Sequence, residues 1–176
     1  MPCPYYGMIF MAQNTPLLDL YRKISRWPCG HWLFSKAVCF KTPYFGSIAP
    51  RITRLEHGRC EARIRDRRAV HNHIGSVHAI ALCNLAELCA GVMTDASLPP
   101  GMRWIPKGMT VSYLKRASGD MHAVATPAIA LVTASCGYDL PVNVDVVDAH
   151  GEKVFHAEIR MWLSPKPSPA SAQAPR

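Results

Sequence analysis

Apolar and small residues fill the stretch from Ala79 to Met93, where only Asn84 and Glu87 are polar. A helix that is apolar on all sides belongs inside a protein. A carboxylate within such a helix loses its hydration, which is costly unless it is paired, hydrogen-bonded or protonated. No lysine or arginine lies within one helical turn of Glu87. The pattern therefore predicts a buried central helix whose acid is satisfied from elsewhere in the fold or is used chemically.

A second stretch with apolar residues at helical spacing lies near the N-terminus, before the central helix. A helix start is indicated at Asn14 to Pro16, and apolar residues then recur every three or four positions up to Trp27, with basic residues on the other side. A second short helix is expected from Trp32 to Phe40. The chain is thus divided into a flexible extension at 1–13, a helical segment packed on the domain at 14–46, the main domain at 47–164, and a disordered Pro/Ser/Ala-rich tail at 165–176.

Alternating apolar and polar residues predict strands on both sides of the central helix. In the segment 59–65 one face is apolar and the other is charged, and we interpret the charged face as solvated. After the helix, strands are expected near 104–115 and 121–126, followed by a β-hairpin at 142–163. Strands that curve as one sheet around a buried helix make an α+β layout. A single sheet of this length cannot enclose the helix alone, so the pattern predicts a dimer.

The composition is that of one globular domain: 176 residues, 49% hydrophobic and 18% charged. No uninterrupted apolar run reaches the roughly 18 residues of a transmembrane helix. The first ten residues lack the features of a signal peptide. The seven cysteines are scattered without a CxxC pair, which favours reduced thiols. We therefore expect a cytoplasmic protein without stable membrane insertion.

The net charge of +8 is concentrated near the N-terminus, because residues 1–60 hold eight Lys or Arg against two acids. Such an excess can attract nucleic acid, an anionic membrane surface or a small molecule that carries phosphates. No nucleic-acid-binding module accompanies the charge, nor does any strand that interleaves aromatic and basic residues. We therefore expect no nucleic-acid partner, and the phosphates of coenzyme A remain candidates.

The residues before the central helix resemble a known family. Asn72, Gly75 and His78 are spaced as Asn-x-x-Gly-x-x-His, and Glu87 follows His78 by nine positions. This spacing is similar to the amide, histidine and carboxylate of hotdog-fold acyl-CoA thioesterases of the phenylacetate-pathway and 4-hydroxybenzoyl-CoA type, and most closely to an uncharacterised hotdog subfamily. The resemblance covers roughly residues 48–163. It implies a hotdog fold, with a curved antiparallel sheet wrapped around one long central helix and here an N-terminal helical extension.

The resemblance implies hydrolysis of an acyl-CoA by a homodimer or a dimer of dimers, with coenzyme A as part of the substrate and no other cofactor. The N–H of Ala79, at the helix N-terminus, would hold the oxyanion. Glu87 would act either as the base that activates water or as the nucleophile. In the family the amide and the acid meet across the dimer interface, so Asn72 of one subunit would lie beside Glu87 of the other. His78 is expected to cap the helix and orient the loop.

The resemblance also places residues around the pocket. Gly75 belongs to the loop that approaches the substrate. Lys107, Lys115 and Arg116 are candidates for binding the coenzyme phosphates at the pocket mouth, with plain surface charge as the alternative. Some relatives carry a hydroxyl residue one turn after the acid. That position is Gly91 here, which puts a water-holding role there in doubt.

Two other functions remain open. His73 precedes Glu87 by fourteen positions, which resembles the spacing in hotdog-fold hydroxyacyl dehydratases, but the prolines of that family are absent between Ile74 and Val77. Alternatively, the same pocket binds an acyl-CoA without turning it over. The three histidines within residues 71–78 have no cysteine or acid close in sequence to complete a tetrahedral zinc site, so no metal is expected.

Overall fold

The computed structural model describes residues 15–167, so the extension predicted at 1–13 and most of the predicted tail lie outside the described residues. The helices of this part are α1 (Pro16–Ile24), α2 (Gly30–Lys41) and α3 (Ala79–Ser97), with short 3-10 helices η1 (Pro43–Ile48) and η2 (Arg68–Val70). The strands are β1 (Arg51–Glu56), β2 (Arg59–Ile64), β3 (Met102–Tyr113), β4 (Met121–Pro127), β5 (Tyr138–Val147) and β6 (Lys153–Pro165).

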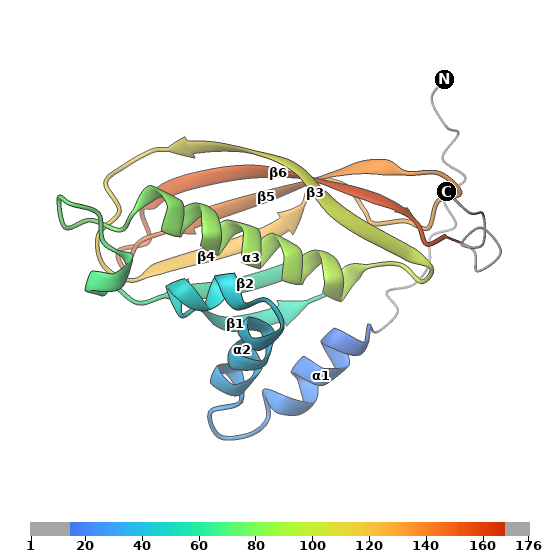
Figure 1. The fold of residues 1–176 in the computed structure, drawn as a ribbon, viewed down its shortest axis with the longest axis horizontal. Coiled ribbons are helices and arrows are strands. Elements are labelled where there is room, and N and C mark those ends of the chain that lie inside the picture. The colour runs from blue at the N-terminus through green and yellow to red at the C-terminus, as the bar shows by residue number, and fades with distance from the viewer. Residues whose placement is uncertain (1–14, 168–176) are drawn as a thin grey trace, which may run out of the picture.

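The strands form one antiparallel sheet in the order β1-β2-β4-β5-β6-β3, curved around α3 (Figure 1). Along β5, the fully buried Leu140, Val142, Val144 and Val146 alternate with less buried residues, so one face of the strand is apolar and forms part of the core. The other inner strands alternate in the same way. This arrangement is the hotdog fold, and it confirms the predicted fold class.

The central helix α3 has 19 residues, of which 13 are buried. Its length and composition would allow it to cross a membrane, a property that the count of uninterrupted apolar residues did not reveal. In the fold, however, 67% of its most apolar window is buried inside the domain. The apolar character of α3 is therefore explained by its place in the core.

The helical segment covers the β1 edge of the sheet. The hydroxyl of Ser35 on α2 accepts a hydrogen bond of 2.8 Å from the N–H of Ile52 on β1, and the Phe34 side chain beside it is fully buried. At the start of α1, Thr15 caps the helix and donates to the carbonyl of Ala96 at 3.2 Å. The segment is thus tied both to the sheet edge and to the end of α3.

Strand β3 forms the opposite edge and runs without a break through Pro106. Its register with β6 shifts between Pro106 and Gly108, so the irregularity is a bulge. Proline is tolerated there because an edge strand has one unpaired side. Among the described strands, β3 pairs with β6 alone.

The cysteines are mostly in the expected state. The free thiols are Cys29, Cys39, Cys60, Cys83 and Cys89. Cys136 is disulfide-bonded. The prediction of reduced thiols is therefore wrong for Cys136, because the spacing of cysteines in a sequence does not show which of them the fold brings together.

Candidate active site

The segment before α3 is a tight loop organised by Asn72. Its side-chain oxygen accepts hydrogen bonds from the N–H groups of Ile74 and Ser76, both at 3.1 Å, and its side-chain nitrogen donates to the Ser76 hydroxyl at 2.8 Å. Gly75 has a φ of +72°, a left-handed conformation that favours glycine. The amide of Asn72 is therefore engaged within its own loop, where it shapes the entry to α3.

His78 caps the helix, as the sequence predicted. Its Nδ1 accepts the N–H of Ile80 at 3.0 Å, and its carbonyl accepts the N–H groups of Ala81 and Leu82 at 2.9 and 3.2 Å. Of the first four N–H groups of α3, only that of Ala79 donates to no described residue. One backbone donor is thus left at the positive end of the helix dipole, where it can accept a developing negative charge.

Glu87 lies in the middle of a narrow stripe along α3 that the sheet does not cover. The residues of α3 that are not buried all lie on this stripe: Ala79, Ile80, Cys83, Glu87, Gly91 and Asp95. Glu87 is half-buried, and it makes no hydrogen bond or ion pair with any other described residue. Within one chain the acid is thus only partly buried, because the stripe turns away from the sheet, and the expected partner across a dimer stays a prediction.

Strand β3 lines both ends of this stripe with aromatic rings. At one end the Tyr113 hydroxyl lies 3.4 Å from the Cys83 thiol, and this hydrogen bond, with partial burial, raises the pKa of Tyr113 to about 12. At the other end the Trp104 ring donates to Asp95 at 2.6 Å. A Cβ at Gly91 would lie 3.2 Å from the Trp104 ring, so glycine makes room for it. Glu87 lies between these two contacts.

The acid and the free N–H are far apart within one chain. Ala79 and Glu87 are eight residues apart on α3, which corresponds to about 12 Å along the helix axis. Groups that act on one carbonyl must lie within about 3 to 3.5 Å of the reacting atoms. A single protomer therefore separates the two groups that the predicted chemistry needs together.

Arg116 and Lys115 lie near the helix entry. The guanidinium of Arg116 donates to the carbonyl of Ile74 at 3.0 Å, which brings it against the loop that contains Gly75. Lys115 forms an ion pair with Glu152 on the neighbouring turn. Arg116 is therefore placed beside the loop, while the charge of Lys115 is already paired.

Lys107 is placed elsewhere. Its ammonium lies 3.4 Å from the centroid of the Trp162 ring and 3.4 Å from a carboxylate oxygen of Asp139. Lys107 lies six residues before the end of β3 at Tyr113, which corresponds to about 20 Å along an extended strand, and Lys115 follows that end. The structure therefore does not gather the three predicted phosphate-binding cations in one place.

His71 and His73, the other two histidines of the loop before α3, have different surroundings. His71 hydrogen-bonds to Asp66, and this bond lowers the pKa of Asp66, whose other oxygen accepts the N–H of Gly119 at 2.8 Å. His73 is exposed. Among residues 15–167, no three His, Cys, Asp or Glu side chains lie close enough together to hold a metal ion. The ties through Asp66 were not visible in the sequence, because Gly119 is 53 positions away.

Comparisons with known proteins place this architecture among described families. The family model for a domain of unknown function, DUF4442, matches residues 30–163. The crystal structure of a genomics target, APC5556, is 44% identical and covers 85% of this chain and 99% of that one, with a TM-score of 0.72. A Pseudomonas aeruginosa protein described as a probable thioesterase is 24% identical, covers 80% and 97%, and has a TM-score of 0.63.

A more distant likeness is to a thioesterase from Haemophilus influenzae, which is 14% identical and covers 88% of this chain and 94% of its own, with a TM-score of 0.61. No curated protein matches the chain. The likenesses at 24% and 14% identity show a shared fold.

Proposed function

Because this chain belongs to the family of the domain of unknown function DUF4442, and because proteins described as thioesterases share its hotdog fold, we propose that it hydrolyses the thioester bond of an acyl-CoA. The proposal rests above all on the N–H of Ala79. This donor has no acceptor among the described residues and lies at the start of a helix. A thioester carbonyl gathers negative charge on its oxygen when it is attacked, and such a donor stabilises that charge.

Glu87 is the proposed catalytic acid–base or nucleophilic group. In the first route its carboxylate takes a proton from water, and the water oxygen bonds to the carbonyl carbon. The carbon–sulfur bond then breaks, and the leaving thiolate of coenzyme A takes the proton. In the second route the carboxylate itself bonds to the carbonyl carbon, the thiolate leaves, and water cleaves the resulting anhydride. Either route yields a carboxylic acid and free coenzyme A without a further cofactor.

Both routes require a second protomer, since about 12 Å separates Glu87 from Ala79 on one helix. The free edge of β3 and the uncovered stripe of α3 adjoin each other, because Trp104 and Tyr113 on β3 contact the stripe. Two protomers joined about a twofold axis along this surface would pair two free strand edges and cover both stripes. We propose that Glu87 of the partner subunit then acts on a carbonyl held at Ala79.

The proposed substrate-binding residues are Gly75 and Arg116. Arg116 is held against the carbonyl of Ile74, next to Gly75, and is therefore the best placed of the three predicted cations to bind a coenzyme phosphate near the helix entry. Lys115 lies next to it in sequence, and phosphate binding there would compete with Glu152. Lys107 is not part of this proposal. The cytoplasmic location stays a prediction.

The direct test is the thioesterase activity of Glu87→Gln. Release of free thiol from a panel of acyl-CoA substrates is expected to fall by about 10²- to 10⁴-fold, because the variant keeps the shape of the side chain and loses its basicity. Asp95→Asn is the matched control, since Asp95 lies two turns further along the same stripe. It is expected to keep its activity.

Full activity in Glu87→Gln would contradict the proposed mechanism. If the wild type releases no thiol from any acyl-CoA of the panel, a binding protein becomes the better interpretation. Formation of a conjugated enoyl product from a 3-hydroxyacyl thioester would instead indicate the dehydratase, in which His73 supplies the base.

A further inference from the structure

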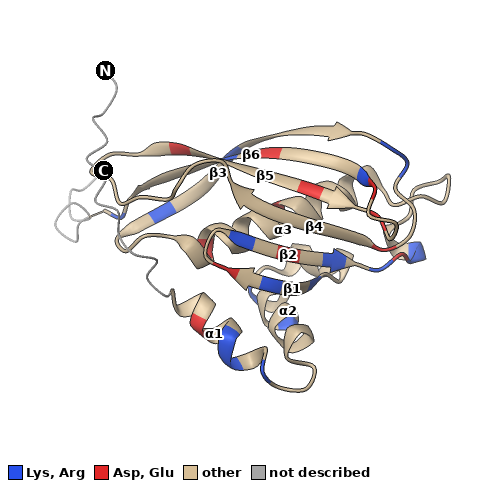
Figure 2. Ribbon diagram, turned by 180° about the vertical axis from the view of Figure 1, so that it is seen from behind, with Lys and Arg blue, Asp and Glu red and all other residues tan. Residues whose placement is uncertain are grey.

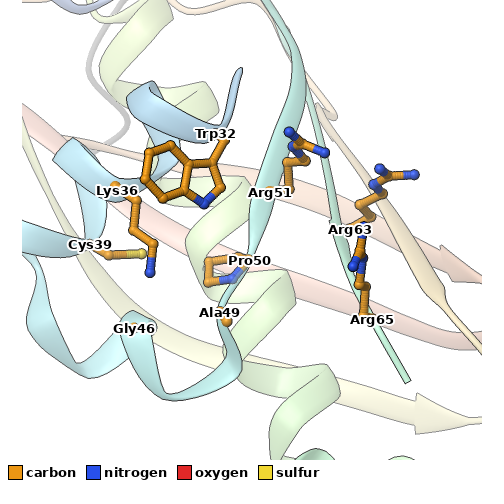
Figure 3. A pocket seen from close by; sticks show the side chains of 9 residues that line it. All are labelled: Trp32, Lys36, Cys39, Gly46, Ala49, Pro50, Arg51, Arg63 and Arg65. Atoms are coloured by element: carbon orange, nitrogen blue, oxygen red, sulfur yellow. The ribbon is translucent and has the colours of Figure 1, made fainter. Parts of the chain in front are cut away.

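A second region of interest is a pocket at the β1 edge of the sheet, the edge opposite β3. It lies where the helical segment meets β1. Its volume is about 310 Å³, which is at the lower end of the range for small-molecule sites. Figure 3 shows Trp32, Lys36 and Cys39 of α2 on one side and three arginines on the other. The residues that line it are Trp32, Lys36, Cys39, Gly46, Ala49, Pro50, Arg51, Arg63 and Arg65.

The lining is strongly basic. It contains Lys36, Arg51, Arg63 and Arg65 and no acid. None of these four cations forms an ion pair with a described residue, although Arg54 and Arg59 on the same two strands pair with Glu56 and Glu61. Lys and Arg lie along β1 and β2 in Figure 2. The pocket therefore concentrates positive charge that no neighbouring carboxylate neutralises. Such a charge attracts an anion.

The positions of two of the arginines carry an energetic cost. Arg51 and Arg63 are directly opposite each other in the β1–β2 pair, an arrangement in which like charges destabilise a sheet. In addition, the Nε of Arg51 is buried without a hydrogen-bond acceptor. A buried donor without a partner destabilises the fold, because it has lost its bond to water and gained none in return. An anion in the pocket would relieve the repulsion, and one that reaches this Nε would also supply the missing acceptor.

The opposite wall carries one aromatic residue, Trp32. Trp32 is 51% exposed, and the Lys36 ammonium lies over one side of its ring, 5.9 Å from the centroid. An exposed indole binds flat heterocycles by stacking on a ring face that no other group covers. The pocket thus offers a stacking surface on one side and phosphate-binding guanidinium groups on the other.

We propose that this pocket binds a nucleotide-type group, in which a planar heterocyclic ring stacks on Trp32 and two or more phosphates bind at Arg51, Arg63 and Arg65. The inference stands apart from the thioesterase proposal, because it uses none of the residues around Glu87. Such a group occurs in free nucleotides and also at one end of coenzyme A. The chemistry of recognition is the same for both sources.

Titration calorimetry of the full chain with ADP, adenosine and inorganic phosphate tests the proposal. ADP is expected to bind at least about tenfold more tightly than adenosine or phosphate, because only ADP uses both walls. The double variant Arg63→Gln, Arg65→Gln should weaken ADP binding by about tenfold or more, and Trp32→Leu should weaken it as well. Arg59→Gln is the matched control, since Arg59 lies on the same strand and pairs with Glu61 outside the pocket.

Three outcomes would overturn the proposal: no binding of ADP, equal binding of ADP and phosphate, or an equal loss of binding in Arg59→Gln. A parallel titration with coenzyme A separates the two sources. If the double variant weakens coenzyme A and ADP alike, the pocket takes the nucleotide end of the coenzyme. If it weakens ADP alone, the pocket is a separate nucleotide site. The thermal unfolding of each variant shows that it is folded.

Discussion

At the scale of single residues, Ala79 gives the sharpest test of the proposed oxyanion site. It is the first residue of α3, and His78 before it has a φ of −64° and a ψ of 137°. Proline fits the first position of a helix, and an extended residue before it is the conformation that proline favours. A proline at this position therefore removes the N–H and keeps the helix.

Ala79→Pro is expected to lower kcat for thioester hydrolysis by about 10²- to 10³-fold, the usual effect of losing one oxyanion donor. The temperature of unfolding should change little, because no described residue accepts this N–H. Steady-state kinetics and thermal unfolding of the same preparation measure both quantities. Wild-type kcat in a folded variant would show that another group holds the oxyanion. Ala79→Gly, which keeps the N–H, is the control.

Some of these residue roles were predictable from the sequence and others were not. His78 directly precedes the apolar run, which is the position of a cap. The engagement of Asn72 within its loop depends on the left-handed backbone at Gly75, and residue spacing does not specify which partner an amide selects. The contact between Cys83 and Tyr113 joins residues 30 positions apart, so only the packing of β3 on α3 reveals it.

At the scale of elements, hydrophobic periodicity predicted the central helix and most strands, because burial on one face imposes the period directly. The second helix runs from Gly30 to Lys41, slightly longer than the expected 32–40. The way α2 closes the β1 edge was not predictable. It includes the bond from the Ile52 N–H to the Ser35 hydroxyl, which joins residues 17 positions apart.

Ser35→Ala is expected to reduce the free energy of unfolding by about 1 to 3 kcal/mol, because the buried N–H of Ile52 would lose its acceptor. Chemical denaturation followed by circular dichroism measures this loss. Ser118→Ala serves as the control, since Ser118 is exposed and surface substitutions usually change stability by less than about 0.5 kcal/mol. Equal stability of Ser35→Ala and the wild type would mean that another group accepts the hydrogen bond from the Ile52 N–H.

At the scale of the whole molecule, the fold class followed from one apolar helix flanked by alternating strands. The basic pocket did not follow, because it arises only when α2 lies against the β1–β2 pair and when the register places Arg51 opposite Arg63. The charged face of the segment 59–65, interpreted from the sequence as solvated, lines this pocket through Arg63 on β2 and Arg65 just after it. Periodicity shows which residues share a face, but it does not show what covers that face.

The central claim is that each active site combines Ala79 of one protomer with Glu87 of the other, and a heterodimer tests it most directly. Protomers carrying Glu87→Gln and Ala79→Pro are co-expressed with different tags, and the mixed dimer is isolated. In this dimer one site would carry both substitutions and the other none. We predict about half of the wild-type activity per dimer, while each parent homodimer is inactive. A heterodimer as inactive as its parents would contradict the account, because every site would then have lost one of its two groups within a single chain.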